Sequence, residues 1–127
     1  MEFTLKTTLN ATAKQIYSTW LSSEGHTNMT GGEASITDKI GGKFTVWDGY
    51  ITGKTIELNP YNRILQSWRT SQFEEHEEDS ILEILLNEIN GETELTLIHS
   101  NVPKDGEHYK EGWENHYFIP MKAFLTN

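Results

Sequence analysis

The chain has 127 residues, of which 35% are hydrophobic and 23% charged, as is typical of one folded domain. Its 10 basic and 19 acidic residues give a net charge of −9, which opposes contact with nucleic acid and with anionic membrane surfaces. No run approaches the roughly 18 apolar residues that a membrane span needs, so membrane insertion is not expected. The absence of cysteine excludes disulfides, and the first residues resemble no secretory signal, so we expect a cytoplasmic protein.

The first predicted elements are a strand and two short helices. Residues 2–9 alternate in apolar character, which favours a half-buried strand. Residues 10–22 change to a helical period, with Asn10 or Thr12 as the N-cap. Residues 22–32 are polar and end in glycine, which predicts a second short helix followed by a loop.

Six strand-like runs follow, separated by turn signals of which Asn90-Gly91 is the clearest. These runs cover residues 33–39, 43–49, 51–58, 63–73, 80–89 and 92–100. Their order and short connections predict a mostly antiparallel sheet.

The C-terminal segment predicts a long amphipathic helix. Its apolar stripe comprises Tyr109, Trp113, Tyr117, Met121 and Phe124, with Phe118 and Leu125 at the edge. Pro120 removes a backbone donor within the helix and should kink it. The polar face offers few basic residues, which argues against a helix that lies on a membrane. This helix is the only predicted element large enough to cover the apolar face of the sheet.

Strand alternation places polar side chains among the inward-facing positions. Asp48 follows Phe44 and Val46, Gln66 stands between Ile64 and Trp68, and His99 follows Leu95 and Leu97. A buried polar group needs a partner or water, so part of the interior is expected to be wet or occupied. A bulge of one residue would instead turn these side chains to solvent.

Three segments resemble the Aha-type family, the homologues of the activator of heat-shock chaperone ATPase. They are GGKFTVWDGYITGKTIELNPYNRILQSWR (41–69), ETELTLIHSNVP (92–103) and GWENHYFIPMKAFL (112–125). The family belongs to a superfamily that includes START lipid-transfer domains, the birch-pollen-allergen fold and polyketide cyclases. The resemblance implies an α+β helix-grip fold over residues 1–127: a curved seven-stranded antiparallel sheet around the C-terminal helix, with a hydrophobic cavity between them. Gln66 departs from the apolar or aromatic residue usual in the family and would make this cavity more polar.

The predicted site is the lining of this cavity, and no catalytic or metal-binding residue is assigned. The expected lining residues are Trp20, Phe44, Val46, Gln66, Trp68, Ile84, Leu97, His99, Trp113, Tyr117 and Met121. Each aromatic residue among them can equally be ordinary core.

Several other residues have two interpretations. His99 is either a satisfied core histidine or a ligand contact, and less readily an acid or base. The acidic run 74–79 around His76 suits a solvated hairpin tip better than a metal site. Turn chemistry can explain Asp48, and Trp47 could lie on the outer sheet face as part of a protein contact with Ile98 and Ile119. The other histidines, His26, His108 and His116, carry no signature.

Three functions remain open, and none requires a cofactor. The first is non-catalytic binding of a small apolar or amphipathic molecule in the cavity. The second is contact with a heat-shock chaperone of the ninety-kilodalton class. The resemblance covers only the C-terminal domain of the eukaryotic activator, so strong ATPase stimulation is not expected. The third is a small cyclase-like enzyme that would use His99, Asp48 and Tyr17, although no known catalytic motif is present.

Overall fold

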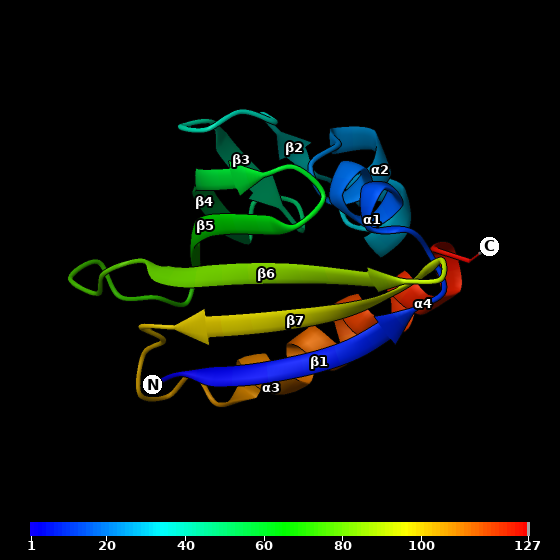
Figure 1. The fold of residues 1–127 in the computed structure, drawn as a ribbon. Coiled ribbons are helices and arrows are strands. Elements are labelled where there is room, and N and C mark those ends of the chain that lie inside the picture. Colours follow the sequence, from blue (N-terminus) through cyan, green and yellow to red (C-terminus); the bar gives the residue numbers. More distant parts are fainter. Residues whose placement is uncertain (127) are drawn as a thin grey trace.

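The computed structural model describes residues 1–126 and shows one curved antiparallel sheet of seven strands, in the order β1-β7-β6-β5-β4-β3-β2, wrapped around C-terminal helical turns (Figure 1). The strands are β1 (Phe3–Leu9), β2 (Ser35–Ile36), β3 (Lys43–Val46), β4 (Ile51–Asn59), β5 (Arg63–Thr70), β6 (Ser80–Ile89) and β7 (Glu92–Ser100). The helices are α1 (Ala13–Trp20), α2 (Ser23–Thr30), α3 (His108–Trp113), η1 (Glu114–Phe118) and α4 (Ile119–Phe124). This arrangement confirms the helix-grip fold expected from the sequence.

The two short helices after β1 are fixed by capping side chains. The Thr12 hydroxyl accepts from the Gln15 N–H at 3.1 Å, and the Gln15 side chain accepts from the Thr12 N–H at 2.8 Å. This reciprocal pair satisfies donors that the first turn of α1 leaves free. The Ser22 hydroxyl caps α2 by accepting from the Gly25 N–H at 3.0 Å, and Gly31 ends the helix with φ of 85°, a conformation that favours glycine.

Three predicted strands, 33–39, 43–49 and 63–73, are shorter in the structure, the last ending at Thr70, and the inward position predicted for Asp48 is wrong. Residues 33–39 contribute only β2, which pairs with β3 at two positions. The run 43–49 ends at Val46 because Trp47, Asp48 and Gly49 all have positive φ, of 54°, 58° and 88°. Asp48 is therefore an exposed turn residue and does not face the interior. Inward and outward side chains alternate only along extended backbone, so the pattern of β3 cannot be continued through residues with positive φ.

The three C-terminal helical segments α3, η1 and α4 follow one another without a break, and we call them the C-terminal rod. Within η1 the hydrogen bonds reach back five residues, as from the Ile119 N–H to the Glu114 carbonyl. This wide turn directly precedes Pro120, whose ring would otherwise meet a carbonyl four residues earlier. The disturbance expected at Pro120 thus takes the form of a π turn.

The π turn changes which side chains of the rod face inward. Phe118 is only 2% exposed, and Leu125 is also buried. Phe124 is 46% exposed, so its predicted place in the buried stripe is wrong. The wheel assumed 3.6 residues per turn throughout, and one wide turn rotates everything that follows it.

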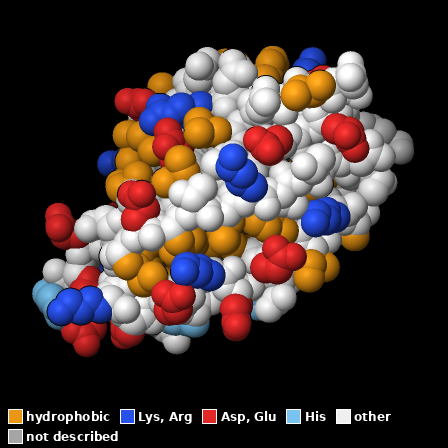
Figure 2. Space-filling model, turned by 60° about the horizontal axis from the view of Figure 1, so that its bottom comes forward, with side chains coloured by type: hydrophobic (Ala, Val, Ile, Leu, Met, Phe, Trp, Pro, Cys, Tyr) orange, Lys and Arg blue, Asp and Glu red, His pale blue; other side chains and the backbone are white. Residues whose placement is uncertain are grey.

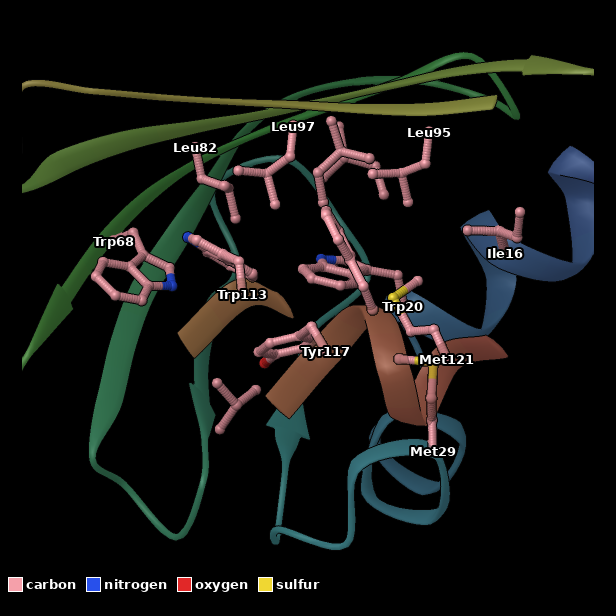
Figure 3. Close-up of a cluster of buried hydrophobic side chains, with 14 of the residues drawn as sticks. Ile16, Trp20, Met29, Trp68, Leu82, Leu95, Leu97, Trp113, Tyr117 and Met121 are labelled. Carbon is pink, nitrogen blue, oxygen red and sulfur yellow. The ribbon is translucent and has the colours of Figure 1, made fainter. Parts of the chain in front are cut away.

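The core lies between the concave face of the sheet and the C-terminal rod. Leu82, Leu95 and Leu97 point from the strands towards the large aromatic side chains beneath them (Figure 3). The indole rings of Trp20 and Trp113 are stacked with centroids 6.3 Å apart, and Trp68 lies 5.7 Å from Trp113. Helices α1 and α2 lie at the same end of the sheet as α4 (Figure 1).

Gly53 allows β4 to approach the backbone of β5 and the side chain of Phe44 closely. A side-chain carbon there would lie 2.0 Å from the Ser67 carbonyl oxygen and 2.5 Å from the Phe44 ring. We expect Gly53→Ala to lower the free energy of unfolding by at least about 3 kcal/mol, because backbone and a buried ring would have to move. Chemical denaturation checks this value.

Gly112 in α3 is the matched control, because a side-chain carbon at this position meets nothing within 4 Å. Gly112→Ala should raise the free energy of unfolding by about 0.5–1 kcal/mol through helix propensity. Equal changes in the free energy of unfolding for the two substitutions would contradict the close approach of Ser67 and Phe44 to Gly53.

Candidate functional site

The interior around Gln66, between the sheet and the C-terminal rod, is filled. A void of only about 10 Å³ remains there, bordered by Trp20, His26, Ile36, Phe44, Val46, Gln66, Trp68, Leu82 and Tyr117. Such a space holds at most about one water molecule. The sequence led us to expect a wet or occupied cavity beside Gln66, and almost no space remains there. An open space between strands and the rod does exist, but it lies beside Trp68, Trp113 and Tyr117.

Gln66 is inward-facing, as predicted, but its polar atoms are satisfied by the protein itself. Its side-chain oxygen accepts from the Trp20 indole N–H at 3.2 Å, and its amide nitrogen donates to the Thr55 hydroxyl at 3.2 Å. All three side chains are buried. The Gln66 amide therefore holds the Trp20 indole in place, and both its oxygen and its nitrogen already have protein partners.

His99 is fully buried and linked in a chain of hydrogen bonds. The Trp113 indole N–H donates to Nδ1 of His99 at 3.1 Å, so the ring proton resides on Nε2. Nε2 then donates to the Ser80 hydroxyl at 2.8 Å, which donates to the Trp68 carbonyl at 2.6 Å. Burial lowers the pKa of His99 to about 3. The geometry is that of a satisfied, neutral core histidine.

A second buried histidine, His26, was missed in the sequence. Its Nδ1 donates to the Trp20 carbonyl at 3.0 Å, and Nε2 accepts from the Tyr117 hydroxyl at 2.9 Å. Burial lowers the pKa of His26, opposed by the hydrogen bond to Trp20, and burial raises the pKa of Tyr117. The available signal was spacing: His26 and Met29 lie three residues apart on the buried face of α2.

A groove of about 530 Å³ lies beside the C-terminal rod, and we call it the aromatic groove. Its lining residues are Trp47, Tyr50, Ile51, Trp68, His108, Tyr109, Glu111, Gly112, Trp113, Asn115, His116 and Tyr117. One side is formed by the turn between β3 and β4 together with Ile51 of β4 and Trp68 of β5, and the other side is the face of α3 and η1. Six of the twelve residues are Trp or Tyr, so the walls are largely aromatic.

Trp47 forms part of this groove because its backbone is held in an unusual conformation. Its φ of 54° is rare for a bulky residue and carries strain. The ring packs edge-on against His116 and Tyr117, at 5.7 and 6.2 Å. Gly32 lies against it, since a side-chain carbon there would meet the indole at 2.5 Å. The suggested position of Trp47 on the outer sheet face is therefore wrong.

The eleven predicted lining residues fall into three groups. Trp68, Trp113 and Tyr117 line the aromatic groove. Trp20, Phe44, Val46 and Gln66 border only the small internal void. The remaining four, Ile84, Leu97, His99 and Met121, are buried in the core and border neither space. Sequence reasoning missed Tyr50, Tyr109 and the polar residues of α3, because strand alternation does not report on a turn or a helix face.

The charge in the groove comes from a few side chains at its rim. Glu111, His108 and His116 are exposed, and neither Lys nor Arg is among the lining residues that the structure describes. Deeper in the groove, burial raises the pKa of Tyr109 to about 12, and its hydroxyl lies 2.7 Å from that of Thr70. Such a surface is suited to binding an apolar or weakly polar group.

The hydrogen bonds of Gln66 can be tested by substitution. We expect Gln66→Leu to lower the free energy of unfolding by about 1–3 kcal/mol, because the Trp20 N–H and Thr55 hydroxyl lose their partner while remaining buried. Thermal and chemical denaturation measure this change. The control is Gln72→Leu at an exposed position, which should change stability by less than about 0.5 kcal/mol. An unchanged or raised stability of Gln66→Leu would contradict the assigned role.

The buried histidines predict a loss of stability in acid. The pKa of His99 is near 3 in the folded chain and about 6.5 when unfolded, so the unfolded state binds more protons between these values. Stability is fully present above about pH 6.5, and His99 alone should remove about 2 kcal/mol between pH 8 and pH 5. The lowered pKa of His26 acts in the same direction.

Measuring the free energy of unfolding at several pH values tests whether His99 causes this decrease of stability with falling pH. His99→Gln should flatten the pH dependence even though the variant is less stable at pH 8. His108→Gln, which replaces an exposed histidine, should leave the slope unchanged. If His99→Gln keeps the slope of the natural chain, the acid sensitivity arises elsewhere.

The sequence has named relatives. It is 30% identical over 122 residues to the mouse "Activator of 90 kDa heat shock protein ATPase homolog 1", and 29% identical over the same length to the human protein of that name. The alignments cover 95% of this chain but 36% of each relative, so the chain spans about a third of their length.

Solved structures show the same fold. A crystal structure described as an HSP90 activator from Plasmodium falciparum matches with a TM-score of 0.91 at 21% identity, covering 98% of this chain and 96% of that one. CalU16 from Micromonospora echinospora matches with a TM-score of 0.81 at 21% identity, covering 98% and 75%. Residues 10–126 match the family described as "Activator of Hsp90 ATPase homolog 1-like protein". The helix-grip fold and the residues matched agree, and the chain belongs to this family.

Proposed function

We propose that this protein is a binding module that contacts a heat-shock chaperone of the ninety-kilodalton class. The observation that carries the proposal is the match of residues 10–126 to the family of Hsp90 ATPase activator homologues. The void of about 10 Å³ beside Gln66 leaves no room for a ligand inside the core, and the larger groove beside the C-terminal rod is open to the surface. Function is then a property of the surface, and the family and its named relatives point to a chaperone as the partner.

The surface of α4 offers apolar side chains for such a contact. Ile119 is 54% and Phe124 is 46% exposed, and both follow the π turn. Both side chains can contribute apolar area to a contact with a partner, and we use them as the probes of that contact. Ile119 was also among the residues that the sequence suggested for a protein contact.

The surrounding charges suit a protein partner. Acidic and basic side chains are interspersed on the face shown in Figure 2, with hydrophobic side chains gathered between them. Such a mixture can pair with a complementary protein surface, whereas the overall charge of −9 disfavours nucleic acid. Among the residues that the structure describes, no helix is long and apolar enough to pass through a bilayer. The proposal keeps the expected cytoplasmic location.

The contact can be tested with the purified chaperone from the same organism. We expect micromolar binding by calorimetry, on the order of 8 kcal/mol, with a modest effect on the ATPase rate. The double substitution Ile119→Ser and Phe124→Ser should weaken binding about tenfold or more, because two apolar contacts are lost.

Ile40→Ser is the matched control. Ile40 is 64% exposed, but it lies in the connection between β2 and β3, away from α4. This variant should bind as the natural chain does. Absence of binding at roughly 100 µM chaperone would reject the proposed function. Equal weakening by both variants would remove α4 as the contact surface.

A further inference from the structure

The aromatic groove has the size of a small-molecule site. Its volume of about 530 Å³ falls within the roughly 300–1,000 Å³ that is usual for such sites. It lies beside α3 and η1, whereas the exposed side chains proposed for the chaperone contact are on α4. The groove is therefore a second surface, and its chemistry can be considered independently of the proposed function.

The walls of the groove favour a positively charged group. Trp47 and Tyr50 on the turn face the helix side, where Tyr109 and Trp113 contribute further rings. The face of an aromatic ring carries negative potential, and a cation within about 6 Å of a ring is attracted to it. The strained backbone of Trp47 fixes one of these rings at the groove instead of on the outer sheet face.

The charges of the groove act in the same direction. Glu111 is the one carboxylate among the lining residues that the structure describes, and no Lys or Arg accompanies it. The neighbouring Lys110 is directed elsewhere, since its ammonium group pairs with Glu107 at 3.0 Å and lies over the Phe3 ring at 5.7 Å. Phosphate or carboxylate ligands would find no cationic partner from Lys or Arg in this lining.

We propose that the aromatic groove binds a small organic cation with an apolar body, such as a substituted ammonium ion. The apolar body would displace water from the aromatic walls, and the charge would lie over the ring faces near Glu111. Charge complementarity and groove volume distinguish this occupant from an anion and from a polypeptide segment. The site does not rest on the chaperone contact, and each can be tested without the other.

Gly112 gives a means to close the groove without disturbing the fold. It lies in α3 on the groove wall, and a side-chain carbon there meets nothing within 4 Å. Gly112→Leu should therefore occupy the groove while preserving or raising the melting temperature. Ser18→Leu, at an exposed position on α1 outside the groove, is the matched control for an added leucine.

The test uses benzyltrimethylammonium as the cation, benzyl alcohol as the neutral compound and benzenesulfonate as the anion, each titrated at pH 8 and followed by NMR. We expect the cation to bind at least about tenfold more tightly than benzyl alcohol, and the anion to bind more weakly still. The indole resonances of Trp47, Trp68 and Trp113 should move. Trp20, which does not line the groove, should move least.

Substitutions locate the interaction. Gly112→Leu should abolish binding of the cation, and Ser18→Leu should not. Glu111→Gln and Tyr50→Leu should each weaken the cation roughly threefold and leave benzyl alcohol unchanged, because they remove charge or an aromatic face. These two variants keep the test decisive if Gly112→Leu is unstable.

Three outcomes would overturn the proposal. Equal binding of cation and neutral compound would show an apolar groove without preference for charge. Undiminished binding in Gly112→Leu, with that variant folded, would place the cation elsewhere. Loss of chaperone binding in Gly112→Leu, together with no cation binding to the natural chain, would assign the groove to the protein partner.

Discussion

The structure depends on one constraint: large aromatic side chains fill the interior, and three of them, Trp20, Trp113 and Tyr117, bring a buried polar atom that needs a partner within the protein. Trp20 donates to Gln66, Trp113 donates to His99, and Tyr117 donates to His26. No buried side-chain nitrogen or oxygen among the described residues lacks a partner. An unsatisfied buried donor costs about 1–3 kcal/mol, so each of these three rings is tied to one particular polar residue on another element.

This constraint explains one correct and one incorrect prediction for the polar interior residues. Their buried positions were predicted correctly, whereas their hydrogen-bond partners are protein groups and not water or a ligand. Alternation along the strands placed Gln66 and His99 inside, and both are buried. From the sequence, their partners were unknown, and a wet or occupied cavity was the natural interpretation. The partners are separated by 46 residues for Trp20 and Gln66 and by 91 for His26 and Tyr117, so no local pattern connects them.

The rest of the fold could be predicted wherever local periodicity and tertiary structure agree. The long strands, the capped α1 and the apolar stripe of the C-terminal rod follow directly from residue spacing. Prediction failed where the backbone leaves its regular form: at Trp47 and Asp48, whose positive φ ends β3, and at the π turn before Pro120. The aromatic groove is built from both of these irregular places, which is why the sequence indicated an interior cavity instead.

The π turn determines which side chains of α4 are exposed and can therefore be substituted without disturbing the core. Because it shifts the phase of the helix by part of a turn, α4 packs Met121 inward while Phe124 is displayed to solvent. Before Pro120, Tyr109, Trp113 and Tyr117 are buried, whereas after it Met121 is buried and Phe124 is exposed. Side chains that α4 exposes to solvent, such as Ile119 and Phe124, can therefore be exchanged with little effect on the packing of the core.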